Sequence, residues 1–123
     1  MSSEGMRLLV AVINDPEKLD ETLSGFVELG ITGATVLNSE GMGRVLANEI
    51  PIFAGLQTLM SGARAQNRLI LSVIPLEKVA PALALLQEVC GNLESPSTGI
   101  AFTLPVDSVV GLAPELGTEA SPI

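Results

Sequence analysis

The sequence predicts an α+β domain whose elements follow the order strand, helix, strand, strand, helix, strand. Three observations predict it. Four short apolar runs are rich in Val, Ile and Leu, two segments between them have helical apolar spacing, and Pro and Gly mark the element ends. This order is the ferredoxin-like βαββαβ pattern with an antiparallel sheet. A length of 123 residues is that of one domain.

The first strand and helix are marked most clearly. Arg7–Ile13 is an apolar run, and Asp15 after it is a good N-cap. Pro16 suits the first helical position, so we expect a helix over Pro16–Leu29 that Gly30 stops. Its inward side is predicted to carry Leu19, Leu23, Phe26 and Val27.

The middle of the chain holds two strands and the second helix. We expect strands over Ala34–Leu37 and Arg68–Ile74, with no clean strand pattern in the segment 38–67 between them. The second helix is predicted over Glu77–Cys90, where Pro81 is tolerable because N–H groups of the first turn have no helical partner. Its inward residues are predicted to be Val79, Leu83, Leu86 and either Val89 or Cys90.

The last part of the chain completes the sheet. Ile100–Leu104 reads as the fourth strand, and Val106–Leu112 as a short edge strand. We expect residues 1–5 to be disordered and the tail 113–123 to be mobile, which leaves 6–112 as the folded domain.

Two strands are apolar on both sides. In Leu8–Ile13 and Leu69–Ile74 nearly every residue is apolar, whereas a strand with one solvated face alternates apolar and polar residues. Two helices cover only one face of such a sheet. We therefore expect a second copy of the chain to cover the other face, in an obligate homo-oligomer.

The composition of the chain disfavours several classes of partner and of catalytic chemistry. The net charge of −8 disfavours nucleic acid and anionic lipid as partners, and no apolar run reaches the ~18 residues of a membrane span. Histidine is absent, and Cys90, the only cysteine, fits a small core residue better than a redox thiol. We expect a cytoplasmic protein without catalytic residues, metal or cofactor. The acidic start of the first helix is expected to be a solvated face.

One stretch carries a family resemblance. Glu28–Val36, followed by Gly41–Arg44, resembles the Gly-(Ile/Val)-Thr-Gly-x-Thr-Val and Gly-x-Gly-Arg segments of the PII (nitrogen regulatory P-II) signalling family. Pro75 at the end of the third strand and Gly99–Phe102 fall where that family has similar residues. The resemblance covers about 6–112. It implies a compact homotrimer that binds ATP or ADP, often with 2-oxoglutarate, between subunits, and whose long T-loop docks on a partner protein. A link to nitrogen metabolism rests on the resemblance alone.

The resemblance also implies a ligand site, and it shows where this chain departs from the family. The departures are Ile100 for the phosphate-binding lysine, Gly111 and Ala113 for two arginines, and Val45 for a glutamine; tyrosine, the site of uridylylation, is absent. We therefore do not expect tight ATP binding, and a nucleotide with fewer phosphates or another small metabolite fits better. The candidate ligand-binding residues are Thr35, Gly41, Met42, Gly43, Arg44, Val73 and Gly99.

Two questions stay open at this point. The segment 45–66 carries apolar residues that either fold back on the trimer or form a partner-binding patch, and its candidate partner residues are Ile52, Phe53, Leu56 and Arg64. Arg44, Arg64 and Arg68 form an anion site or are scattered solvated charges. The first functional hypothesis is a trimeric regulator that senses a small metabolite and acts on an unknown protein target. The alternative is a structural or interaction trimer with vestigial clefts.

Overall fold

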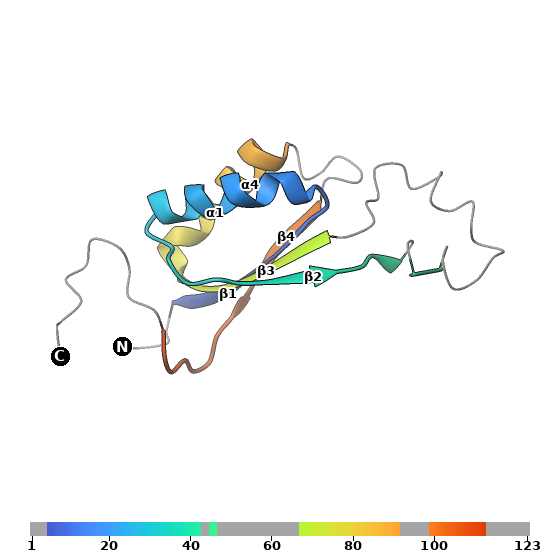
Figure 1. The fold of residues 1–123 in the computed structure, drawn as a ribbon. Helices are drawn as coiled ribbons and strands as arrows, with labels where there is room; N and C mark the ends of the chain where they lie inside the picture. Colours follow the sequence, from blue (N-terminus) through green and yellow to red (C-terminus); the bar gives the residue numbers. More distant parts are fainter. Residues whose placement is uncertain (1–4, 43–44, 47–66, 92–98, 113–123) are drawn as a thin grey trace.

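A computed structural model describes residues 5–42, 45–46, 67–91 and 99–112 of the chain. Two helices lie on one face of a four-stranded sheet (Figure 1). Each helix is preceded by a 3₁₀ turn, at Pro16–Lys18 and Leu76–Lys78. In chain order the elements are β1 Met6–Ile13, α1 Leu19–Glu28, β2 Thr35–Ser39, β3 Asn67–Pro75, α4 Val79–Cys90 and β4 Gly99–Pro105. The predicted ferredoxin-like element order is confirmed.

The sheet is antiparallel throughout and has the order β2-β3-β1-β4. Val10 in β1 lies opposite Leu71 of β3 and Phe102 of β4, which fixes the register across the centre. Directly opposed residues of an antiparallel ladder share a face. The register therefore shows which strand residues lie on the face of the sheet beneath the helices and which lie on the opposite, open face.

Local signals in the sequence explain both ends of the helical segment that the 3₁₀ turn Pro16–Lys18 and α1 form together. The Asp15 carboxylate accepts a hydrogen bond of 3.0 Å from the Glu17 N–H, which confirms the predicted N-cap. Gly30 adopts φ +86°, and the Ile31 N–H donates to the Phe26 carbonyl at 2.8 Å in the arrangement of a Schellman motif. Glycine ends the helix here because it adopts positive φ without steric cost.

The core lies between the helices and the inner face of the sheet. It is aliphatic apart from one ring, and its side chains come from every main element except β2 and β4. Its fully or nearly fully buried members are Leu9, Ala11, Ile13, Phe26, Ile31, Ile70, Ile74, Ala82 and Leu86. Leu19, Leu23, Val79, Leu83 and Cys90 pack against this cluster while partly exposed, much as the helical spacing predicts.

The inward position predicted for Val27 is wrong. Its side chain is 46% exposed, while Thr22 and Gly25 are buried on the side facing α4. The reason is the close approach of the two helices at Gly25, where a Cβ atom would lie 2.6 Å from the side chain of Leu85. Because Gly25 has no side chain, α1 packs with Thr22, Gly25 and Phe26 on its buried side, and Val27 lies on the exposed side.

The edge strand predicted over Val106–Leu112 is not present. The Val106 N–H still donates to the Met6 carbonyl at 3.3 Å, but the chain bends at Asp107 and again at Val110 and Gly111. The apolar residues at the end of this segment, Val109, Val110 and Leu112, instead line a pocket. The predictions for 1–4, for most of 38–67 and for the tail 113–123 lie outside the described residues.

Candidate functional site: a pocket where two strands diverge

The face of the sheet that the helices leave open is almost entirely apolar. The rows of β1, β3 and β4 on this face carry Leu8, Val10, Val12, Leu69, Leu71, Val73, Ile100, Phe102 and Leu104. Ile100, Phe102 and Leu104 are each exposed by between 43% and 56%. A contiguous apolar surface of this kind marks an interaction site, because single exposed apolar residues are common but joined rows of them are not.

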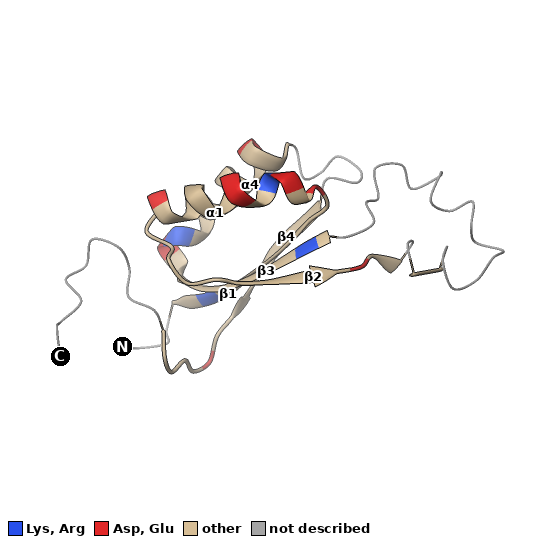
Figure 2. Ribbon diagram, in the orientation of Figure 1, with Lys and Arg blue, Asp and Glu red and all other residues tan. Residues whose placement is uncertain are grey.

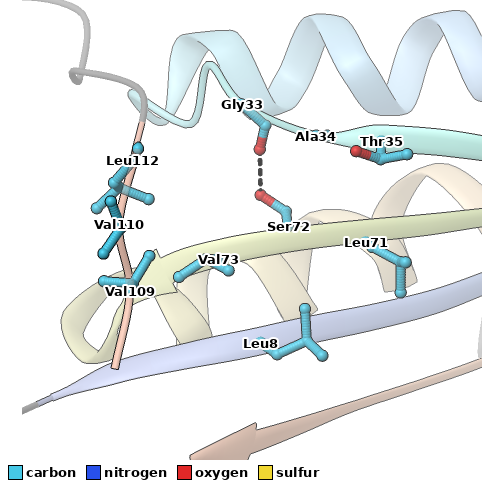
Figure 3. A pocket seen from close by; sticks show the side chains of 11 residues that line it. Leu8, Gly33, Ala34, Thr35, Leu71, Ser72, Val73, Val109, Val110 and Leu112 are labelled. Carbon is cyan, nitrogen blue, oxygen red and sulfur yellow. Dashed lines mark hydrogen bonds between the residues drawn. The ribbon is translucent and has the colours of Figure 1, made fainter. Parts of the chain in front are cut away.

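A pocket of about 340 Å³ opens beside this face, at the start of β2 (Figure 3). Three stretches of chain line it together with Leu8: Gly33–Thr35 before and in β2, Leu71–Val73 in β3, and Val109–Leu112 after β4. The apolar segment mistaken for an edge strand is thus one wall of the pocket. Figure 3 shows it crossing the end of β1 and β3.

The pocket exists because two ladders of the sheet differ in length. The β2–β3 ladder ends at the pair Thr35–Leu71, whereas the β1–β3 ladder continues to the pair Met6–Pro75. Beyond Leu71 the chain before β2 therefore separates from β3. The space between them is the pocket.

Ser72 holds the two walls together at this point. Its side chain is only 3% exposed, and its hydroxyl donates a hydrogen bond of 2.5 Å to the carbonyl of Gly33 (Figure 3). A buried hydroxyl without a partner would be costly, and the Gly33 carbonyl lies outside the β2–β3 ladder. This bond therefore fixes the backbone of the turn that forms the upper wall in Figure 3.

No charged side chain from the described part of the chain lines the pocket. Three of the four described cations donate hydrogen bonds elsewhere: Arg7 to the Met6 carbonyl at 2.8 Å, Arg68 to the Asn67 carbonyl at 3.4 Å, and Lys78 to the Leu29 carbonyl at 2.5 Å. The fourth, Lys18, lies in the 3₁₀ turn before α1 and does not line the pocket. Most acidic side chains of the described residues lie on the helical layer (Figure 2). The polar groups at the pocket are the hydroxyl of Thr35 and backbone amides, because Ser72 lies opposite the buried Leu9 and its hydroxyl points toward the helices.

The structure brings together two of the predicted site residues, Thr35 and Val73, in this pocket. Gly41 and Met42 follow the far end of β2 and do not line it, and the Met42 side chain is 73% exposed. Gly43 and Arg44 lie outside the described residues, as do the predicted partner residues Ile52, Phe53, Leu56 and Arg64.

Gly99 has a structural reason to be glycine. It opens β4 with φ +139°, and a Cβ atom there would lie 2.2 Å from the carbonyl oxygen of Val12 on the neighbouring strand. No side chain fits in that space. It does not line the pocket, and its assignment as a ligand residue stays a prediction that rests on the resemblance.

Sequence reasoning missed Leu8, Ser72 and the 109–112 wall. The one signal for Ser72 was a lone hydroxyl within an otherwise apolar strand, since a buried polar side chain requires a partner. Nothing in the periodicity shows where Val109–Leu112 crosses the sheet.

Other chemistry is limited in the described residues. No group of His, Cys, Asp and Glu there could hold a metal ion. Cys90 is half-buried with its sulfur 4.0 Å from the Thr22 hydroxyl, and burial raises the pKa of its thiol. The thiol is therefore mostly protonated near neutral pH, as suits a core residue. Within the described parts, no helix is long and apolar enough to cross a membrane.

Taken together, the fold and pocket define an α+β ferredoxin-like domain with a small, uncharged cavity beside an apolar sheet face. The family model of nitrogen regulatory protein P-II matches residues 6–115, and the chain belongs to that family. The match confirms the resemblance seen in Glu28–Arg44 and extends three residues beyond the predicted domain end.

A solved structure supports the same fold. The crystal structure of Arabidopsis thaliana PII bound to citrate matches with a TM-score of 0.59 and 19% sequence identity, and the match covers 85% of each chain. At that identity the likeness concerns the fold. Among curated proteins, no sequence matches this chain.

Proposed function

We propose that this protein is a non-catalytic regulatory subunit that assembles as a homotrimer, takes up a small molecule at the pocket and regulates a partner protein. One observation carries the proposal. The same strand, β2, forms a pocket wall at Thr35 and leads from Ser39 into the 38–67 segment. A ligand that moves Thr35 therefore acts on the strand from which that segment departs.

Family membership supports the regulatory class, because P-II proteins are signalling proteins that bind small molecules and target proteins. The citrate in the Arabidopsis thaliana structure belongs to that protein. For this chain we propose that the ligand site is the pocket described above, and that the target contacts the 38–67 segment.

The apolar open face supports the homotrimer. A contact of ordinary size removes about 800 Å² per subunit from water. The apolar part of this area stabilises the assembly by about 25 cal/mol per Å², and this contribution offsets the association cost of about 4–15 kcal/mol. Leu8, Leu71 and Val73 belong both to this face and to the pocket. Assembly through the face would bring a neighbouring subunit to the pocket border.

Triphosphate binding in the manner of the family is not expected. At the position of one family arginine this chain has Gly111, which lines the pocket without any side chain. Each lost charge-assisted hydrogen bond costs about 1.5–3 kcal/mol of binding free energy. The cation-free lining is also the observation that favours the second candidate, a structural trimer whose clefts bind nothing.

Two measurements test the proposal. Light scattering at micromolar concentration is expected to give three times the mass of the 12.7 kDa chain, and a stable monomer would refute the assembly. Pull-down from lysate with the full chain and with a variant lacking 45–66 is expected to differ in at least one captured protein. If both forms capture the same proteins, the segment 45–66 takes no part in partner binding.

Calorimetric titration of the purified protein with ATP, ADP, AMP, cyclic AMP and 2-oxoglutarate separates the two candidates. The regulatory proposal expects binding of a member with one phosphate or none in preference to ATP. Micromolar ATP binding would show that the argument from missing cations is wrong. If none of these compounds binds, the result would count against a nucleotide sensor and in favour of the structural trimer.

A further inference from the structure

We propose that the pocket selects an uncharged, compact, largely apolar ligand of about ten to fifteen non-hydrogen atoms, and discriminates against anions. This inference rests on the proposed function, because it names the ligand class for the same site. It differs from phosphate recognition, because the affinity comes from contact with the apolar surface of the ligand and from the single hydroxyl of Thr35.

The size of the cavity sets the first limit. A water molecule occupies about 30 Å³ in the liquid, so the 340 Å³ of the pocket corresponds to roughly eleven water volumes. A ligand of one or two rings fits this space. A nucleoside triphosphate, with about thirty non-hydrogen atoms, would leave most of its polar part outside the described walls.

The lining sets the second limit. Six of the eleven lining residues are Leu or Val: Leu8, Leu71, Val73, Val109, Val110 and Leu112. An anion buried against such a surface loses hydration, and the described lining residues offer it no cation, only backbone N–H groups and the Thr35 hydroxyl. The net charge of −8 adds an unfavourable long-range potential for any anion.

A bound cation is disfavoured as well, because none of the described acidic side chains lines the pocket. An uncharged ligand avoids both penalties. Removing its apolar surface from water contributes about 25 cal/mol per Å².

The polar groups set the third limit. Ser72 lies opposite the buried Leu9, so its hydroxyl points toward the helices and donates to the Gly33 carbonyl, and it is not offered to a ligand. The Thr35 hydroxyl can donate or accept. Thr35 lies opposite Leu71 on the open face, so a neutral ligand with an amide, hydroxyl or ring N–H group can both donate to its hydroxyl and accept from it, whereas a carboxylate or phosphate offers only acceptors.

The test uses the full-length protein with labelled Leu and Val methyl groups. The probes are pairs that differ in charge but hardly in size: benzamide and benzoate, naphthamide and naphthoate, adenosine and AMP. Methyl NMR titration follows the pocket residues Leu8, Leu71, Val73, Val109 and Leu112, with Leu86 and Val89 in α4 as distant reporters.

The expected result is that the neutral member of at least one pair shifts the pocket methyl signals, and that its anionic partner binds at least about tenfold more weakly. A Thr35→Val variant is expected to weaken the neutral probe about three- to tenfold. Ser24→Ala, on the exposed side of α1, is the control and is expected to leave the affinity unchanged.

Preference for the anionic members would overturn the ligand class while the proposed regulatory function would stand. Pocket methyl groups that respond to no probe up to millimolar concentration would overturn the inference too. Failure of the proposed function is seen separately, as a monomer in light scattering or as captures that do not depend on the 45–66 segment.

Discussion

Phe102 lies in the row of β4 that faces away from the helices, opposite Val10, and is 43% exposed. Its replacement by glutamate tests whether the open face joins subunits. A phenylalanine presents on the order of 200 Å² of surface, so Phe102 has about 85 Å² left to bury, worth roughly 2 kcal/mol per subunit or about 6 per trimer. Burying a carboxylate there adds several kcal/mol per subunit. Phe102→Glu is therefore expected to dissociate the trimer.

Val27→Glu is the matched control. Val27 is also apolar and 46% exposed, but it lies on the outer side of α1. Size exclusion with light scattering over a concentration series measures the mass of each variant, and circular dichroism verifies the fold. The reasoning predicts that Phe102→Glu is a folded monomer and that Val27→Glu stays a trimer. A trimeric Phe102→Glu, or equal dissociation of both variants, would refute it.

Three further predictions concern stability and reactivity. Gly99→Ala is expected to lower the free energy of unfolding by roughly 2–4 kcal/mol in a urea titration, because the new Cβ meets the Val12 carbonyl; a loss within about 0.5 kcal/mol would contradict the close approach. Ser72→Ala leaves the Gly33 carbonyl without its partner and is expected to cost about 1–3 kcal/mol, and an unchanged urea midpoint would show that water replaces the hydroxyl. Cys90 is expected to react with iodoacetamide at about pH 8 more slowly than an exposed cysteine, since burial raises the pKa of its thiol and the reactive thiolate forms only as the pH rises further; faster alkylation would contradict the buried setting.

Much of the fold follows from local sequence. Asp15 and Gly30 mark the ends of the first helical segment through a side-chain acceptor and a positive φ, both of which are properties of single residues. Strand positions follow from apolar runs. The open apolar face could also be predicted, because Leu8–Ile13 and Leu69–Ile74 lack the alternation of a solvated strand.

The rest depends on contacts between distant residues. The outward turn of Val27 follows from the absence of a side chain at Gly25, which matters only once α4 places Leu85 against it. The pocket depends on the difference in length between two ladders, and a ladder end is a property of a strand pair. The apolar residues of Val106–Leu112 suggested a strand, but a segment that crosses the sheet can carry the same residue types.

The most direct test of the account measures hydrogen exchange in the segment 38–67 of the assembled wild-type protein, with and without the neutral probe that shifts the pocket methyl signals. Because β2 joins the pocket to this segment, the account predicts that exchange in 38–67 changes on ligand binding and that the Thr35→Val variant needs a higher probe concentration for the same change. Shifted pocket signals together with unchanged exchange in 38–67 would contradict the proposed link between ligand and partner.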